Sequence, residues 1–386
     1  MDFRLTPEQL ELQDTARRFA TEQMRSVGRD IEQSAQPLSH DWLHRYAEMG
    51  FLGINVATEY GGMGLGNLEA LLVLEEFAKV SPAAAFPIFE SSVGPVRAIE
   101  HFAGEALKRR VLPAVCRGDL IVAVAMSEPD AGSALTDLKT TARIEGGQIV
   151  LNGQKRWSSG SGHSGGYVVY CRMSDAPGAA GIGAVYVEKD TPGVAFGQPE
   201  QLLGFRGIPS ADIFLDDVRV PQENLIVPAG GFKKLMEAFD LERCGNATMC
   251  LGIAAGALED ALQYVQERRQ FGKPIVDFQA VQLKLADMAM QVEATRLLIH
   301  RAAQNASEGL PSMLESSVAK CFANQAVRDV CGNALQLLGA YGYSTQFPME
   351  QRLRDGWGWG IAGGTIDIQR VNIASALVGR RFNQRA

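Results

Sequence analysis

The sequence predicts an α+β fold in three parts: a helical domain over residues 1–118, a β domain over residues 119–229 and a helical bundle over residues 230–386. Apolar residues recur at helical spacing in the first and last parts, whereas short segments rich in β-branched and aromatic residues fill the middle. The length agrees with this division, because 386 residues are more natural for two or three domains than for one.

The first part opens with a helix-starting signal. Thr6 and Gln9 form a capping box, in which each side chain satisfies a free backbone amide of the other, and Pro7 suits the first helical turn. Helical spacing then continues through LELQDTARRFATEQM, WLHRYAEMGFLG and LEALLVLEEFAKV, with Gly and Pro as breaks. We therefore expect this part to be mostly helical.

The hydrophobic period changes at Leu120. Five short segments separated by Gly, Pro or Asp predict strands: LIVAVAMSE, GQIVLNGQKRW, GYVVYCR, GIGAVYVEKD and ADIFLDDVRV. Long helical patterns return after VPAGGF, over residues 232–268, 278–307, 313–338 and 365–380. A four-helix bundle is the economical interpretation of the last part.

Composition excludes several classes of function. The 37 Lys and Arg residues against 44 Asp and Glu give a net charge of −7, so no general basic field exists for a nucleic acid or an anionic membrane. The longest apolar run, from Leu120 to Met126, is far shorter than the ~20 residues of a membrane span. The N-terminus shows no secretion signal, and the six cysteines form no CxxC pair, so we expect a cytoplasmic protein.

Three short motifs point to chemistry that their context does not support. Residues 160–165 match GxGxxG and residues 162–166 match GxSxG, but both precede the strand segment YVVYC and no helix follows. This segment is therefore interpreted as a turn, without a nicotinamide site or a nucleophilic serine. His40 and His44 share a helical spacing, but no nearby Cys or carboxylate set completes a metal site.

Separated segments together resemble the acyl-CoA dehydrogenase family, in matching order and over essentially the whole chain. They are MSEPDAGSALTDLKTTA, NGQKRWSSGS, ERRQFGKPIVDFQAVQLKLADM, ALQLLGAYGY and GIAGGTIDIQR. The resemblance implies an FAD-dependent enzyme in which two helical domains flank a β domain. It also implies an acyl-CoA substrate and an electron-transfer flavoprotein or a similar acceptor.

The resemblance assigns three cofactor contacts to the β domain. Ser127 stands where a Thr or Ser hydroxyl meets the flavin ring, Trp157 stands where an indole covers one flavin face, and Ser159 stands where a group donates a hydrogen bond to flavin N5. Ser133 is similar to a residue near the thioester ligand.

Five further cofactor contacts are implied in the helical bundle. Arg268 is suited to the FAD pyrophosphate and Phe271 to packing the cofactor, both from a neighbouring subunit, which implies an oligomeric site and a homotetramer. Gln336 and Gly339 correspond to residues beside the dinucleotide, and Thr365 to a residue against FAD.

The expected catalytic base departs from the usual family pattern. Dehydrogenation of an acyl thioester needs a carboxylate, with a pKa raised by a dry site, to remove the α proton. The family usually supplies a Glu just before the Gly-Thr of the last segment, but here that position is Gly363. A minority of the family, including isovaleryl-type enzymes, carries the base at the position of Glu242. We therefore predict Glu242 as the base, with the Gly363 amide available to the thioester oxygen.

Other interpretations of these residues stay open at this point. Glu242 could be an exposed helical residue paired with Arg268, Lys233 or Arg243, and Arg243 resembles an orienting charge beside the substrate. A flavin-dependent desulfinase or monooxygenase is an alternative, because some desulfinases share IAGGT and RGIP, although they lack the helix-borne Glu. A non-catalytic subunit of a mixed oligomer is another, with degenerate FAD contacts as its expected sign. The missing side chain at Gly363 favours a branched or bulky acyl group.

Overall fold

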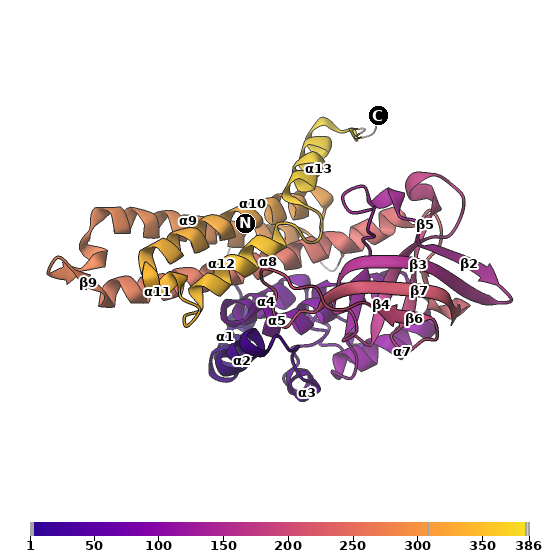
Figure 1. Cartoon of the computed structure of the whole chain (residues 1–386), viewed down its shortest axis with the longest axis horizontal. Helices are drawn as coiled ribbons and strands as arrows, with labels where there is room; N and C mark the ends of the chain where they lie inside the picture. Colours follow the sequence, from indigo (N-terminus) through magenta and orange to yellow (C-terminus); the bar gives the residue numbers. More distant parts are fainter. Residues whose placement is uncertain (1–3, 307–308, 383, 385–386) are drawn as a thin grey trace.

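The computed structural model describes residues 4–306, 309–382 and 384. Its three parts follow the chain: N-terminal helices, a sheet at one end of the molecule, and long C-terminal helices that extend away from the sheet (Figure 1). No helix in these residues is both long and apolar enough to cross a membrane.

The N-terminal part is helical, as predicted. Its elements are α1 (Pro7–Phe19), the π-helical turn η1 (Ala20–Met24), α2 (Arg25–Ser34), α3 (His40–Glu48), η2 (Thr58–Tyr60), α4 (Asn67–Val80), α5 (Pro82–Ile88), the π-helical turn η3 (Phe89–Val93), α6 (Val96–Phe102) and α7 (Glu105–Cys116). The predicted capping box starts α1, since the Gln9 amide donates to Thr6 Oγ1 at 3.2 Å and the Thr6 amide donates to Gln9 Oε1 at 2.9 Å.

The middle part is one mostly antiparallel sheet. Its elements are β1 (Val122–Ala125), η4 (Leu135–Asp137), β2 (Thr141–Glu145), β3 (Gln148–Ser159), β4 (Gly166–Arg172), η5 (Gly178–Gly181), β5 (Ile182–Glu188), β6 (Val194–Phe196), β7 (Ser210–Pro221), η6 (Gln222–Asn224) and β8 (Leu225–Val227). The strand order is β6-β7-β3-β2-β4-β5-β8, and β1 pairs in parallel with β4. Residues 160–165 form a turn between β3 and β4, as predicted.

The C-terminal part consists of α8 (Phe232–Glu267), β9 (Arg269–Gln270), β10 (Lys273–Pro274), η7 (Ile275–Asp277), α9 (Gln279–Asn305), α10 (Met313–Leu338), α11 (Ala340–Tyr343), α12 (Met349–Trp359) and α13 (Ile366–Val378). Helix α12, which the sequence pattern did not predict, lies along α8 and α10, while α13 leaves the bundle at a steep angle (Figure 1). Glycine lowers helix propensity, yet a Cβ at Gly358 would lie 2.4 Å from Phe205 Cζ, so this glycine permits close packing.

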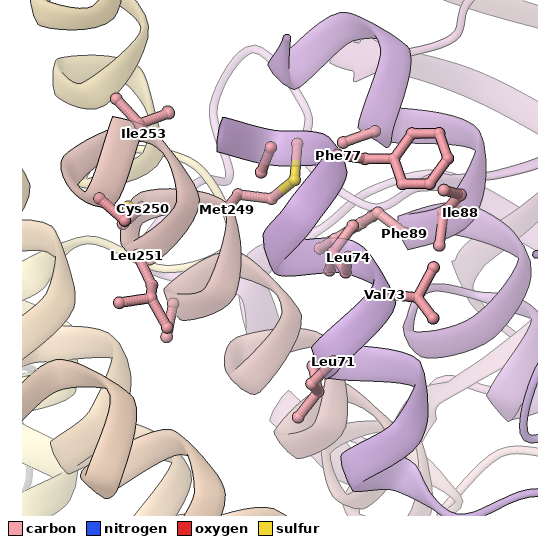
Figure 2. Close-up of a cluster of buried hydrophobic side chains, with 14 of the residues drawn as sticks. Leu71, Val73, Leu74, Phe77, Ile88, Phe89, Met249, Cys250, Leu251 and Ile253 are labelled. Carbon is pink, nitrogen blue, oxygen red and sulfur yellow. The ribbon is translucent and has the colours of Figure 1, made fainter. Parts of the chain in front are cut away.

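The core joins the N-terminal helices to α8. Leu74 and Phe77 of α4 belong to one apolar cluster with Phe89 of η3 and Met249 of α8 (Figure 2). A Cβ at Gly252 would lie 2.5 Å from Ala78 Cβ, so glycine lets α8 approach α4 closely. The middle of α8 therefore packs between the N-terminal helices and α10.

Candidate active site

Glu242 lies in the first half of α8. Its side chain keeps part of its surface exposed, yet burial raises its pKa to about 8, against the opposing positive charges of Arg243 and Lys320. None of the alternative pairings is formed: Lys233 Nζ lies 3.7 Å from Glu237, and Arg243 binds Asp240. Arg268 follows the end of α8, about 39 Å along the helix axis at 1.5 Å per residue. Glu242 is therefore a carboxyl without the pairing expected of a surface residue.

Arg243 is buried and is paired with a carboxyl on its own helix. Its guanidinium binds Asp240 one turn earlier and lies 5.4 Å from the centroid of the Phe239 ring. Asp240 also accepts a 2.8 Å hydrogen bond from Ser316 Oγ on α10. These contacts join α8 to α10, so a direct role of Arg243 at the substrate stays a prediction.

A buried lysine fixes the segment before Gly363. Lys320 Nζ donates to Asn324 Oδ1 at 3.0 Å, to the Trp359 carbonyl at 3.2 Å and to the Ala362 carbonyl at 2.9 Å. Asn246 Nδ2 donates to the same Trp359 carbonyl at 3.2 Å. Burial lowers the pKa of Lys320 to about 7. Sequence reasoning missed Lys320, although a lysine within the apolar pattern SSVAKCFA is a recognisable signal.

Gly363 and its neighbour adopt left-handed backbone conformations. Their φ angles are +64° for Gly363 and +86° for Gly364. The buried Gln369 of α13 donates from Nε2 to the Gly364 carbonyl at 3.1 Å and so clamps the turn. The amide of Gly363 donates to no group within the described part of the chain, which leaves it available for a ligand oxygen.

Glu242 and Gly363 face a common space. A Cβ at Gly363 would lie 3.6 Å from Phe239 Cζ on α8, 3.7 Å from Asn246 Nδ2 on α8 and 3.7 Å from Lys320 Cε on α10. Phe239, Glu242 and Asn246 are three and four residues apart, so they share one face of the helix. The two positions at which the family resemblance places a base therefore converge, and only one of them holds a carboxyl.

Trp157 stands out from the sheet beside two serines. It has a φ of +60° and is 52% exposed, and a β-bulge between Lys155 and Ser158 interrupts the pairing of β3 with β7. The Arg156 guanidinium lies 4.3 Å from the Trp157 ring centroid, and the Arg156 amide donates to the Ser127 carbonyl at 2.9 Å. Ser127, Trp157 and Ser159 thus meet at one edge of the β domain.

A second buried lysine supports that edge. Lys155 Nζ donates to the Met126 carbonyl at 3.1 Å and to Glu128 Oε1 at 2.8 Å. Glu128 also accepts from the Thr140 amide at 2.9 Å. Each side chain is buried, so the pair fixes the loop that carries Ser127 against β3. Sequence reasoning assigned no role to either residue.

Four predicted cofactor residues lie at the far end of the bundle. Arg268 and Phe271 lie beside β9, and Gln336 and Gly339 lie beside α11, opposite the β domain (Figure 1). Phe271 has a φ of +51° and is 93% exposed. A single chain therefore does not bring these four residues together with Trp157.

The remaining predicted residues have separate surroundings. Thr365 Oγ1 accepts from the Ile368 amide at 3.3 Å, which makes this residue the N-cap of α13. Ser133 lies in the exposed loop just before η4. Thr136 and Asp137 of η4 line an open hollow of about 500 Å³. Arg172 also lines this hollow and donates to the carbonyls of Thr136 and Ala176 at 2.8 and 3.0 Å.

The two helix-spaced histidines have different neighbours. His44 Nε2 lies 3.2 Å from Asp119, whereas the His40 ring centroid lies 6.1 Å from that of His163. Across the described ranges, no group of three or more His, Cys, Asp or Glu residues is placed to hold a metal ion.

Comparison with known proteins decides the family. Three family models match consecutive parts of the chain: the N-terminal domain of acyl-CoA dehydrogenases over residues 6–119, the middle domain over residues 123–218 and the C-terminal domain over residues 229–378. The chain belongs to the acyl-CoA dehydrogenase family. The predicted family, fold class and enzyme class are thereby confirmed, since these enzymes are oxidoreductases acting on the CH–CH bond of an acyl-CoA.

Relatives within the acyl-CoA dehydrogenase family carry different reaction names. The chain is 38% identical over 99% of both chains to a 3-sulfinopropanoyl-CoA desulfinase of Paraburkholderia xenovorans. It is 37% identical to an acryloyl-CoA reductase (NADH) of Anaerotignum propionicum, over 98% of this chain and 97% of that one. The family alone therefore does not decide the reaction.

Solved structures confirm the architecture and the cofactor of the family. Butyryl-CoA dehydrogenase from Megasphaera elsdenii matches with a TM-score of 0.94 and 31% identity, over 98% of this chain and 100% of that chain. An FAD complex of PigA matches with a TM-score of 0.92 and 27% identity, over 98% and 99%. The exposed Trp157 indole beside Ser127 and Ser159 fits FAD, because a large aromatic ring held outward in a left-handed conformation leaves a face for a planar ligand.

Proposed function

We propose that this protein catalyses the α,β-dehydrogenation of an acyl-CoA with FAD as cofactor and Glu242 as the base. The observation that carries the proposal is the convergence of Glu242 and Gly363 on one space, in which Glu242 supplies the carboxyl and Gly363 supplies a free amide. The absence of a side chain at Gly363 leaves room beside Phe239 and Asn246 for a branched or bulky acyl group.

In this mechanism the α proton moves to Glu242. With a pKa of about 8, the Glu242 carboxylate is a stronger base than an ordinary glutamate. The difference between its pKa and that of the weakly acidic α carbon is therefore smaller, which favours transfer of the proton. Negative charge then develops on the thioester oxygen, where the Gly363 amide donates a hydrogen bond that strengthens as the charge grows. FAD would be held beside Ser127, Trp157 and Ser159, and when bound it would supply the acceptor for the hydride that leaves the β carbon; an electron-transfer flavoprotein or a similar acceptor would reoxidise the enzyme.

Desulfination is the competing reaction, because the 38% identical relative is named a desulfinase. A sulfinate group would bring an additional anion towards Glu242. The buried cations nearby are already bound, Arg243 to Asp240 and Lys320 to three acceptors. An anionic acyl group therefore lacks a counter-charge among the described residues of this space, which favours dehydrogenation.

Titration with acyl-CoAs tests the proposed reaction. A panel of straight and branched acyl-CoAs is expected to bleach the flavin absorbance, and kcat/KM is expected to rise about tenfold per pH unit up to about pH 8, because only ionised Glu242 removes the proton. Absorbance spectra and a pH series measure both. Release of sulfite from 3-sulfinopropanoyl-CoA, with no acyl-CoA able to bleach the flavin, would contradict dehydrogenation and support the competing reaction.

We also infer that each FAD site is built by two subunits of a homo-oligomer, with a tetramer as the expected assembly. Ser127, Trp157 and Ser159 lie on the β domain, whereas Arg268 and Phe271 lie at the far end of the bundle. The outward position of Phe271, at 93% exposure, supports a role on a neighbouring subunit.

Mixed oligomers test the shared site. Trp157→Ala and Arg268→Glu are each expected to lower FAD content and activity when expressed alone. The two variants are then co-expressed with different tags, and mixed oligomers are purified through both tags. In these oligomers some sites combine Trp157 from the Arg268→Glu subunit with Arg268 from the Trp157→Ala subunit. A substantial fraction of the bound FAD and of the activity should therefore return. FAD absorbance per subunit and the sedimentation of the mixture measure the result. An active, FAD-saturated monomer, or a mixture no better than its components, is the contrary outcome.

A further inference from the structure

A second buried carboxyl lies on the π-helical turn η3. Glu90 is 3% exposed, and its Oε2 has no hydrogen-bond partner among the described residues. The adjacent serines are satisfied: Ser91 Oγ accepts from the Gly53 amide at 3.3 Å, and Ser92 Oγ accepts from the Ile54 amide at 3.2 Å. Because a buried polar atom without a partner is destabilising, Glu90 calls for an explanation that the packing of η3 does not give.

The turn that carries Glu90 packs against α8 beside Glu242. A Cβ at Gly245 would lie 2.4 Å from Val93 Cγ2 and 2.9 Å from Phe89 Cε2, and Gly245 follows Glu242 by one helical turn. Phe89 shares its apolar cluster with Met249 of α8 (Figure 2). Burial and the negative charge of Glu242 raise the pKa of Glu90 well above its usual range. Glu90 therefore lies close to the proposed base, and its carboxyl holds a proton more readily than an ordinary glutamate does.

Glu90 also borders a small cavity. Glu90 and Ser91 line a cavity of about 10 Å³ together with apolar residues such as Leu120 and Val122. This volume is near the lower limit for one water molecule, so it leaves no room for an acyl chain. Buried cations elsewhere are engaged, for Arg97 binds Glu100 and Arg243 binds Asp240. Neither of these buried cations therefore partners the Glu90 carboxyl.

We propose that Glu90 is a specificity-determining residue at the distal wall of the acyl site, where it selects acyl groups that carry a hydroxyl beyond the reacting carbons. This proposal rests on the proposed dehydrogenation. A protonated carboxyl presents one donor and free acceptor positions, and a hydroxyl complements both. A hydrocarbon chain would leave the buried carboxyl unsatisfied, and an anionic chain would approach two carboxyls.

Matched pairs of substrates test the selection. The pairs are 4-hydroxybutanoyl-CoA with pentanoyl-CoA and 5-hydroxypentanoyl-CoA with hexanoyl-CoA, in which a hydroxyl replaces a methyl group. In at least one pair, the wild-type protein is expected to favour the hydroxyl member at least about tenfold in kcat/KM, because sites built for a hydrogen bond reject analogues that lack it. Glu90→Leu should abolish or reverse this preference, and Glu90→Gln should retain part of it. Wild-type preference for the methyl member in both pairs, or an equal change of both members in Glu90→Leu, overturns the proposal.

Thermal unfolding gives an independent readout. Glu90→Leu removes a buried group without a partner, so its Tm should equal or exceed that of the wild-type protein. Ser91→Ala on the same turn removes a satisfied hydroxyl and should lower the Tm while leaving the hydroxyl preference unchanged. A lower Tm in Glu90→Leu together with an unchanged preference would assign Glu90 to structure alone. If no acyl-CoA bleaches the wild-type flavin, the dehydrogenation fails first, and calorimetric binding of the same pairs then decides the role of Glu90.

Discussion

Glu242→Gln is expected to leave the flavin oxidised when a good acyl-CoA is added. Gln keeps the shape and hydrogen-bonding capacity of the side chain but cannot accept the α proton. The rate of flavin reduction should fall by at least the ~10² to 10⁴ typical of a lost general base. Stopped-flow absorbance measures this rate, and the spectral shift of the flavin on ligand binding should show that the acyl-CoA still binds.

Glu237→Gln provides the matched control on the same helix. Glu237 lies 3.7 Å from Lys233 at the surface, so this change should leave the reduction rate close to that of the wild-type protein. Flavin reduction at the wild-type rate in Glu242→Gln would exclude Glu242 as the base. The base would then have to be sought among the other buried carboxyls, of which Glu90 lies on the turn that packs against this part of α8.

The sequence correctly predicted those helices and strands that have a clear local pattern, such as a helix cap or a hydrophobic period. The capping box at Thr6 starts α1, and the change of period at Leu120 leads into the strands. Helix α12 escaped prediction because its two glycines weaken the helical pattern. The reason for them lies elsewhere in the chain: a Cβ at Gly356 would meet Val327, and a Cβ at Gly358 would meet the ring of Phe205. Three short strands, β2, β6 and β8, were also not predicted, since three to five residues hold too little periodic signal.

The resemblance located the catalytic positions, but the polar residues that hold them became visible only in three dimensions. Lys320, Gln369 and Glu90 each lie within an apolar sequence pattern, and nothing local reveals which carbonyl or carboxyl each one faces. Lys320 contacts residues about forty positions away along the chain. Sequence periodicity predicts which residues are buried, but it does not predict which distant groups they contact. These polar residues could therefore be recognised as unusual for a buried position, but their hydrogen-bond partners and roles could not be predicted.

Gly363→Glu is expected to restore flavin reduction to the Glu242→Gln variant. The new Cβ would meet Phe239, Asn246 and Lys320 at 3.6 to 3.7 Å, which is ordinary contact, so the pocket accepts the side chain without displacement at its base. The rate should rise about 10²-fold above that of the single variant, as expected when a general base is regained. It should stay below the wild-type rate, because the φ of +64° costs about 1–3 kcal/mol for a residue with a Cβ.

The pH profile distinguishes this rescue from a nonspecific effect. Lys320 beside position 363 carries a positive charge below its pKa of about 7 and should then lower the pKa of the new carboxyl, so the rising limb of kcat/KM should move below the value of about 8 expected with Glu242. Gly363→Gln in the same Glu242→Gln background has the same bulk and strain but no base, and it should stay inactive. If both double variants are equally inactive while retaining FAD and a wild-type Tm, then the two positions do not address the same α carbon, and the convergence of α8 with the Gly363 turn has no catalytic meaning.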